Sequence, residues 1–432
     1  MEVKVAPASS GAPVASVHRP PSVPPRHPSG AAVRDTFSPL ADARVRPLLA
    51  GHLLGRLTPG MMVLAIVLAA REAGYAYATA GLIAGGHQLG VALGSPLQGR
   101  VADAVGHRRV LVPDGVVYVS GAVLLALALG TGLPGVALAA LALGVGLASP
   151  PMTACARAAL GALYGPGRAR ERAFVLTVVN VELGFIIGPL LTAGLAALFG
   201  GAAAVVGAGA AVAVGTLVYA GAPRDAATAA NGRLAAALRP GGLVEVLRAP
   251  GLIAVVVAYM AVASTFGAFD LFAAATAEAL GRPSLAGTYI ALIAVASLGG
   301  GLFYGARVWA GTLRVRMRRL TALFALALLP VPLVAGDPVL LGVALAVSGA
   351  LIGPLNVCGF QLIDDLAPPR GRAETQSWIQ AALYLGGAVG GVLGGGVIDL
   401  FGPRPAMLVG VVGGAVAVAV LGGSRALRRL EA

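Results

Sequence analysis

Charged residues are scarce in this sequence. Asp, Glu, Lys and Arg make up 11% of its 432 residues, whereas an average soluble domain carries about 25%. So few charges cannot cover a water-soluble fold of this length, which excludes an ordinary soluble enzyme. The hydrophobic fraction of 57% also excludes a wholly disordered chain, because disordered chains are poor in apolar residues. The sequence therefore predicts a protein whose surface faces lipid over most of its area.

Cysteine and metal-binding motifs are scarce as well. The two cysteines, Cys155 and Cys358, lie in apolar stretches, so we expect neither a disulfide framework nor a metal site from them. The sequence has no phosphate-binding Walker loop and no His/Glu zinc motif. The acidic pair Asp364 and Asp365 lacks a third carboxylate at helical spacing, which would be needed to hold Mg²⁺. These absences disfavour an enzyme and an ATP-driven pump, and we expect no cofactor.

Lysine is nearly absent, because Lys4 is the only one among 31 basic residues. This use of arginine, together with much Ala, Gly, Val and Leu, is typical of a GC-rich bacterial genome. The net charge is +13, but the basic residues lie between apolar runs and not along one face. They therefore indicate the orientation of a membrane protein and not the binding of nucleic acid.

Apolar runs follow one another with short gaps from about residue 46 to 423. Because a membrane-spanning helix needs roughly 20 residues, they predict an all-α polytopic membrane protein with two groups of six spans. We expect the twelve spans near 47–70, 76–97, 110–130, 134–157, 173–199, 201–221, 250–275, 284–305, 320–336, 338–362, 374–399 and 404–423. The remaining segments are a disordered cytoplasmic tail (1–45), a cytoplasmic linker (222–249) and a second tail (424–432), which delimit helix bundles at 46–221 and 250–423.

The distribution of the basic residues tests this arrangement. With the N-terminus in the cytoplasm, the cytoplasmic loops and tails hold 26 basic residues, and the outer loops hold three, Arg71, Arg282 and Arg404. Membrane proteins carry such an excess on the cytoplasmic side, and one span more or fewer would destroy it. We therefore expect a multi-pass protein of a bacterial plasma membrane with both termini in the cytoplasm, working as a monomer without a nucleic-acid partner.

The segment between spans 2 and 3 contains a motif. It matches the loop 2–3 motif of the major facilitator superfamily at Gly99, Asp103, Gly106, Arg108 and Arg109. On this motif the chain resembles that family of secondary transporters over about residues 45–425. The resemblance implies two six-helix pseudo-repeats that rock around a central cavity, and a latch at these five residues that holds one conformation. The alternative is that the arginines only fix the topology.

Span 5 contains a second motif. Its Gly184, Gly188 and Pro189 resemble the antiporter signature of exporting members of that family, which implies efflux. Glycine and proline at these places allow close packing and a bend, so generic helix packing is the alternative. Exporters of the drug/proton class carry an arginine within span 4, whereas Arg157 lies near the cytoplasmic end of that predicted span. We therefore assign Arg157 no role from the sequence.

Charged groups inside the predicted spans are the strongest functional candidates, because each is costly unless it is paired or hydrated. Arg56 lies roughly 15 Å into span 1 at 1.5 Å per residue. We expect it to face the cavity and to bind an anionic group or balance a carboxylate; pairing with a neighbouring span for assembly is the alternative. Glu182, close to Asn180 in span 5, is the first candidate for reversible proton binding.

Asp270 in the outer part of span 7 is the second candidate. Phe266 and Phe269 lie close to it in the sequence and suit an amphipathic substrate or a cation; an interfacial charge near the outer surface is the alternative. Asn356 in span 10 is expected to line the cavity. Asp399 closes span 11, where we expect it to cap a helix or form an ion pair at the outer face.

These features predict a secondary active transporter. Its substrates are a small organic, amphipathic molecule and protons, and the proton gradient drives efflux by alternating access. Proton-coupled uptake of a sugar or another small metabolite is the alternative. A sensor that binds a ligand without transporting it is a third hypothesis.

Overall fold

A computed structural model describes the protein over residues 37–165, 167–223, 251–307, 309–366 and 372–424, with side chains from residue 378 onward in the last range. Over these residues the chain forms helices joined by short loops, without strands. Most of the predicted tails and linker, at 1–45, 222–249 and 424–432, lies outside the described residues. The all-helical fold class is confirmed.

The N-terminal group of helices supplies the first six crossings. After the short turn η1 (Ser38–Ala41), it consists of α2 (Val45–Glu72), α3 (Tyr77–Val105), α4 (His107–Leu129), α5 (Gly135–Leu147) with α6 (Met152–Tyr164), α7 (Arg168–Phe199) and α8 (Gly201–Ala220). The C-terminal group supplies the other six. It consists of α11 (Leu252–Ala279), α12 (Leu285–Gly305), α13 (Leu313–Leu328) with α14 (Val331–Val334), α15 (Pro338–Gly349) with α16 (Ile352–Leu366), α17 (Arg372–Phe401), and η2 (Arg404–Met407) with α18 (Leu408–Gly423).

The twelve crossings agree with the sequence-based prediction. Among the described residues, 11 helical stretches are long and apolar enough to cross a membrane. The twelfth crossing, α3, has 29 residues, but His87, Gln88 and several glycines make it less apolar. Several crossings consist of two helical pieces. In one of them Pro150 and Pro151 separate α5 from α6, because proline lacks the N–H that a continuous helix would use and disfavours the helical conformation of the residue before it.

The helices extend beyond the apolar runs that predicted them. α3 continues to Val105 and α4 begins at His107, so the loop expected between spans 2 and 3 is reduced to Gly106. Gly106 has a φ of 98°, a left-handed conformation that glycine adopts without strain. A helix need not end where the hydrocarbon ends, because water satisfies the backbone groups of its last turn.

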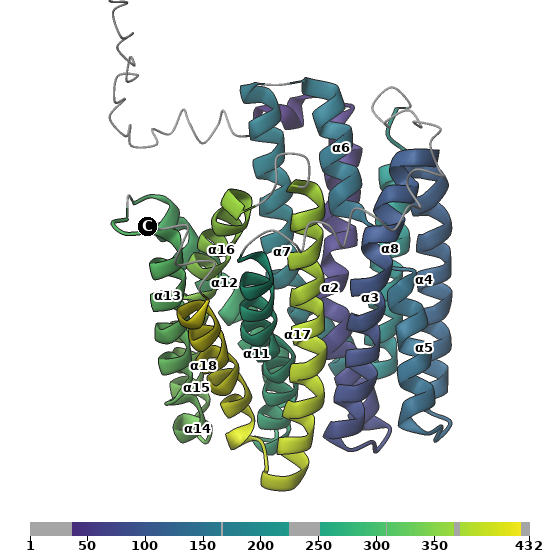
Figure 1. The fold of residues 1–432 in the computed structure, drawn as a ribbon. Helices are drawn as coiled ribbons and strands as arrows, with labels where there is room; N and C mark the ends of the chain where they lie inside the picture. Colours follow the sequence, from purple (N-terminus) through teal and green to yellow (C-terminus); the bar gives the residue numbers. More distant parts are fainter. Residues whose placement is uncertain (1–36, 166, 224–250, 308, 367–371, 425–432) are drawn as a thin grey trace, which may run out of the picture.

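Two seams join the groups. α3 packs against α17, and α7 packs against α12. In Figure 1 the N-terminal group, in purple and blue, stands beside the C-terminal group, in green and yellow. Within the groups, α2 lies against α7 and α8, and α11 lies against α17 and α18.

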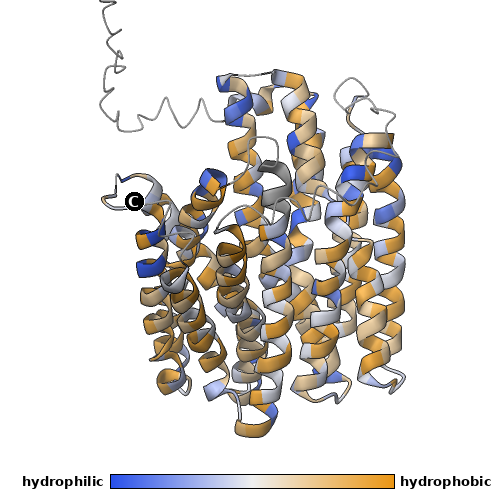
Figure 2. Ribbon diagram, viewed as in Figure 1, coloured by the Kyte–Doolittle hydropathy of each residue, from blue (hydrophilic) through white to orange (hydrophobic). Residues whose placement is uncertain are grey.

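The hydropathy of the surface follows the axis of the bundle. Figure 2 shows apolar residues over the middle and hydrophilic residues gathered at the end where α2 begins, which we call the basic end. Large apolar side chains are exposed around the bundle, including Leu333 (83%) and Val339 (74%). Lipid solvates such side chains, whereas water does not. The protein is thus a multi-pass membrane protein.

Glycine lets α17 lie close to a helix on either side. A Cβ on Gly267 of α11 would strike the carbonyl oxygen of Gly387, and a Cβ on Gly81 of α3 would strike that of Gly391. Such backbone contact is possible only for very small residues. The glycine-rich stretch 386–396 therefore packs between α11 of its own group and α3 of the N-terminal group.

Candidate functional site

Arg56 lies on α2 where that helix touches α7. A Cβ on Gly184 would strike the Arg56 carbonyl oxygen, so the two backbones are in contact there. The guanidinium carbon lies 5.7 Å from the centre of the Phe185 ring. The Nε atom is buried and has no hydrogen-bond partner among the described residues. Arg56 therefore presents a positive charge inside the bundle, and no described carboxylate forms an ion pair with it.

Glu182 lies on α7, close to this contact. Its side chain is half-buried. Arg56 acts on its carboxylate electrostatically, although the two groups do not form a direct ion pair. Because α7 begins at Arg168 and not at 173, Glu182 lies about 21 Å along the helix at 1.5 Å per residue.

A hydrogen-bonded network lies beside Arg56, towards the basic end. Asn180 Nδ2 donates to the Leu49 carbonyl oxygen (2.9 Å) and to His52 Nδ1 (3.3 Å). Since an amide nitrogen only donates, His52 Nδ1 accepts, which leaves Nε2–H to donate to Thr153 Oγ1 at 3.1 Å. The network joins α2, α6 and α7. Asn180 thus holds the helices that carry the charged residues.

Arg157 belongs to the same region, which the sequence did not reveal. It lies on α6 one turn beyond Thr153, and its side chain is exposed. Its Nε donates to Thr177 Oγ1 at 3.4 Å, and Arg56 lies within electrostatic reach of it. α6 continues to Tyr164, so the helix extends beyond the predicted span end at 157. We call Arg56, Arg157 and Glu182 the arginine cluster.

Asp270 lies on α11, in the other group of helices. α11 continues to Ala279, which leaves about 13 Å of helix beyond Asp270 at 1.5 Å per residue. The helix thus extends one turn past the predicted span end at 275. Its half-buried carboxylate forms no hydrogen bond or ion pair with any described residue.

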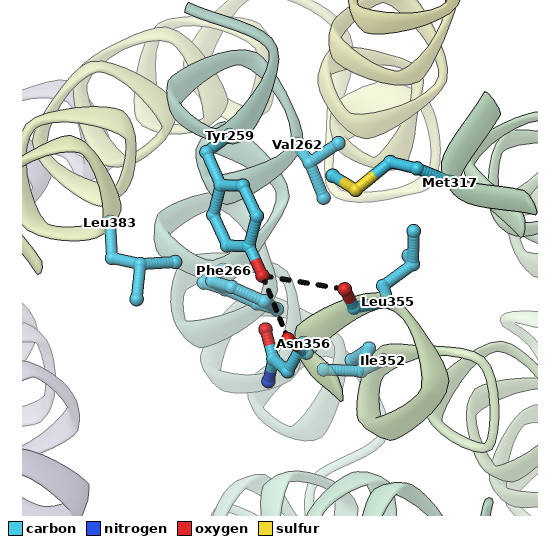
Figure 3. Close-up of a pocket in the computed structure, with 8 residues that line it drawn as sticks. All are labelled: Tyr259, Val262, Phe266, Met317, Ile352, Leu355, Asn356 and Leu383. Atoms are coloured by element: carbon cyan, nitrogen blue, oxygen red, sulfur yellow. Dashed lines mark hydrogen bonds between the residues drawn. The ribbon is translucent and has the colours of Figure 1, made fainter. Parts of the chain in front are cut away.

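A small pocket opens on the same face of α11. It is lined by Tyr259, Val262, Phe266, Met317, Ile352, Leu355, Asn356 and Leu383. Figure 3 shows the Asn356 side chain beside the Phe266 ring, and the Tyr259 hydroxyl donates to the Leu355 and Asn356 carbonyl oxygens, both at 3.3 Å. Because Tyr259, Phe266 and Asp270 follow at intervals of seven and four residues, they share one helical face. Asp270 thus stands one turn beyond the pocket.

The structure therefore separates the sequence-predicted site residues into two sets. Arg56, Glu182 and Asn180 meet on the N-terminal group. Asp270 and Asn356 lie on the C-terminal group, with Asp270 one turn from the pocket that Asn356 lines. The sequence missed Tyr259, whose one available signal was its seven-residue spacing from Phe266.

Polar contacts tie the two groups together at the end opposite the basic end. Arg71 and Glu278 form an ion pair at 3.0 Å, and the Tyr77 hydroxyl donates to Glu278. The Asp399 carboxylate accepts hydrogen bonds from the backbone N–H groups of Tyr77 (2.9 Å) and Ala78 (2.7 Å). Asp399 thus caps α3 from α17, as expected, and closes this end of the interface.

The residues of the loop 2–3 motif lie at the basic end. Gly99 and Asp103 are inside α3, Arg108 and Arg109 are inside α4, and Gly106 separates the helices. The Asp103 side chain is 66% exposed, and its carboxylate lies 3.9 Å from His107 Nε2. Asp103 forms no hydrogen bond with a described residue. The five residues are close in the fold, and Asp103 is not engaged as a helix cap here.

The span 5 motif lies in the packing of α7. A Cβ on Gly188 would lie 2.8 Å from the Leu57 carbonyl oxygen of α2. On another side, the Pro189 carbonyl oxygen touches Gly287 of α12. Together with Gly184, these residues let α7 fit between α2 and the other group of helices.

Two further features bear on the choice of site. A groove of about 490 Å³ between α11, α17 and α18 has an almost entirely apolar lining, including the exposed Val389, Leu393 and Val412. It lacks the charged groups that a coupling site needs. Over the described part of the chain, no group of three or more His, Cys, Asp or Glu side chains could hold a metal ion.

Comparisons with known proteins agree with the fold. The model of the Major Facilitator Superfamily matches residues 48–391, and no curated protein matches the sequence at a significant level. The structure of the nucleoside transporter NupG is similar, with a TM-score of 0.68, 15% identity, and coverage of 89% of this chain and 100% of that chain. The structure of the human organic anion transporter MFSD10 is also similar, with a TM-score of 0.61 and 18% identity. The match covers 87% of this chain and 98% of that chain.

A third similar structure is a bacterial homologue of the human lysosomal transporter Spinster, in an inward-facing and occupied conformation. Its TM-score is 0.66 at 16% identity, and the match covers 89% of this chain and 97% of that chain. Identities this low concern the fold and not the cargo. The family model covers most of the chain, and the twelve crossings fit it. The chain belongs to the major facilitator superfamily of secondary transporters.

Proposed function

We propose that the protein is a proton-coupled exporter of small amphipathic organic molecules. It works by alternating access in a bacterial plasma membrane, with the basic end in the cytoplasm. The excess of arginine at that end supports the orientation. The similar structures belong to transporters of different cargo, a nucleoside and an organic anion by name. The choice of cargo therefore rests on the site itself.

The observation that carries the proposal is the isolated carboxylate of Asp270. It stands inside the membrane-spanning part of α11 without a hydrogen bond or an ion pair to a described residue. An unpaired charge in the membrane is costly, so this group alternates between a proton and a cationic partner. The Phe266 ring one turn away suits the apolar or cationic part of a substrate.

Competition at Asp270 explains exchange. A carboxylate that holds a proton cannot also form an ion pair with a cation, so the proton and the cationic end of the cargo exclude each other. A carrier that changes state only when the carboxylate is occupied then moves protons in and cargo out. We assign Glu182 a different role, since Arg56 is its electrostatic neighbour: it balances part of the arginine charge.

Inside-out membrane vesicles test this function. Respiration acidifies their interior, and the quenching of an acridine dye reports the gradient. A cationic rhodamine methyl ester added to vesicles with the wild-type protein should enter in exchange for protons and restore the acridine fluorescence. With Asp270→Asn the fluorescence should stay quenched, because an amide cannot cycle a proton.

Asp337→Asn is the matched control. Asp337 caps α15 through its Oδ1 atom, which accepts from Val339 N (2.8 Å) and Leu340 N (2.9 Å), and asparagine caps helices equally well. This variant should behave like the wild type. Full recovery of fluorescence with Asp270→Asn would overturn the assignment of the proton to Asp270.

A further inference from the structure

The arginine cluster carries more positive charge than its own carboxylate can balance. Arg56 and Arg157 form no ion pair with a described carboxylate, and Glu182 is an acid within electrostatic reach of Arg56. Within the described part of the chain, Arg56 Nε is buried without a hydrogen-bond partner, and Arg157 has the Thr177 hydroxyl as its one hydrogen-bond partner, at 3.4 Å. A guanidinium group without a hydrogen-bond acceptor inside the helix bundle can bind an anion.

The depths of the two charged sites follow from a shared reference point. Arg71 and Glu278 form an ion pair at 3.0 Å, so α2 and α11 are level there. Counting back along each helix at 1.5 Å per residue puts Arg56 about 22 Å and Asp270 about 12 Å from that level. The two positions therefore differ in depth by about 10 Å, and Arg56 lies nearer the basic end.

We infer that the cargo is dipolar: a cationic or aromatic end faces Asp270 and Phe266, and an anionic end, such as a carboxylate, binds Arg56. Arg157 is the second positive group and lies on α6, which ends at the basic end. The anionic end adds the negative charge that the cluster lacks. This inference rests on the proposed function and names the chemical class of its cargo, an amphipathic zwitterion.

The chemistry favours an oxyanion over other acceptors. A guanidinium group offers parallel N–H donors that match a carboxylate or a phosphate in two-point contact. Phe185 covers one face of the Arg56 guanidinium at 5.7 Å, which leaves its edge for such a contact. A neutral acceptor would make hydrogen bonds but would leave the excess charge in the membrane unbalanced.

A pair of dyes that differ in one charge tests the inference. A rhodamine with a free carboxyl group is a zwitterion, and its methyl ester is a cation of nearly the same size. Binding of each dye to the purified protein, in a neutral detergent without anionic lipid, is measured by fluorescence polarisation. The variants are Arg56→Gln and Arg56→Lys, with Arg282→Gln in the exposed loop between α11 and α12 as the matched control.

The wild type should bind the free acid more tightly than the ester. Arg56→Gln should weaken binding of the acid about tenfold to a hundredfold, as expected for losing a hydrogen bond to a charged group, and should leave the ester unchanged. Arg56→Lys should restore part of the affinity for the acid. Unchanged ester binding shows that Arg56→Gln is folded, so an equal affinity of this variant and the wild type for the acid would overturn the inference.

Other results separate this inference from the proposed function. If Asp270→Asn loses both dyes while the wild type does not distinguish acid from ester, the cargo is not dipolar but the Asp270 site stands. If Asp270→Asn binds both dyes normally, the proposed function fails even where Arg56 still selects the acid. If binding of phosphatidylglycerol depends on Arg56 and binding of the free-acid dye does not, the arginines hold a lipid headgroup, and the inference is wrong.

Discussion

At the scale of single residues, a charged residue can be recognised from the sequence as a site candidate only where it interrupts an apolar run. Arg56 and Glu182 stand deep inside such runs, and the structure places them close together on α2 and α7. Arg157 was not predicted as a site residue because the apolar run ends beside it, whereas α6 continues to Tyr164. The path of a helix beyond the hydrocarbon depends on tertiary packing and water, which hydropathy does not record.

Glu182 provides a test at this scale. Glu182→Gln removes the negative charge that competes for Arg56, so the free-acid rhodamine should bind about tenfold more tightly, the effect of one charge at roughly 10 Å in an effective dielectric near 20. Titrations by fluorescence polarisation measure the change, and ester binding serves as the control. Proton-driven exchange should persist in the vesicles; its loss would show that Glu182, and not Asp270, carries the proton.

At the scale of helices, glycine decides which elements approach. The run 386–396 in α17 packs closely on both sides, because the Cβ of a larger residue at 395 would meet α3 and one at 390 would meet α11. The partners of these glycines come from segments far away in the sequence, so no local pattern could have named them.

Two neighbouring glycines of α17 provide a matched test. A Cβ on Gly395 would strike the Tyr77 carbonyl oxygen of α3, whereas a Cβ on Gly396 would meet no atom within 4 Å. Gly395→Ala should therefore destabilise the protein by about 1–3 kcal/mol, the usual cost of overpacking, and should lower its melting temperature. Gly396→Ala should melt at or above the wild-type temperature. Equal melting of the two variants would contradict the close contact of α17 with α3.

At the scale of the whole molecule, the number of crossings followed from hydropathy together with the asymmetry of charge. α3 shows why both hydropathy and charge asymmetry were needed, since its polar and glycine residues keep its hydropathy below that of the other crossings. What the sequence could not supply is the relation between the two groups of helices. The ion pair of Arg71 with Glu278, and the cap that Asp399 places on α3, join residues more than two hundred positions apart in the chain.

The orientation of the molecule can be tested by labelling. Cysteine introduced at Arg282, in an exposed loop at the end opposite the basic end, should react with a membrane-impermeant maleimide in intact cells. Cysteine at the exposed Arg168, which begins α7 at the basic end, should react only after permeabilisation. The native Cys155 and Cys358 are buried and should give a low background. The opposite pattern would reverse the proposed direction of transport.

The most direct test of proton-driven export at Asp270 is accumulation in proteoliposomes with an acidic interior and the membrane potential clamped. The wild-type protein should concentrate the rhodamine methyl ester inside above the external level, because each proton that leaves drives a cation in. Asp270→Asn should at most bring the dye to equal concentrations on both sides. Accumulation against the gradient by this variant, or none by the wild type with a dye that it binds, would contradict proton-driven exchange at Asp270.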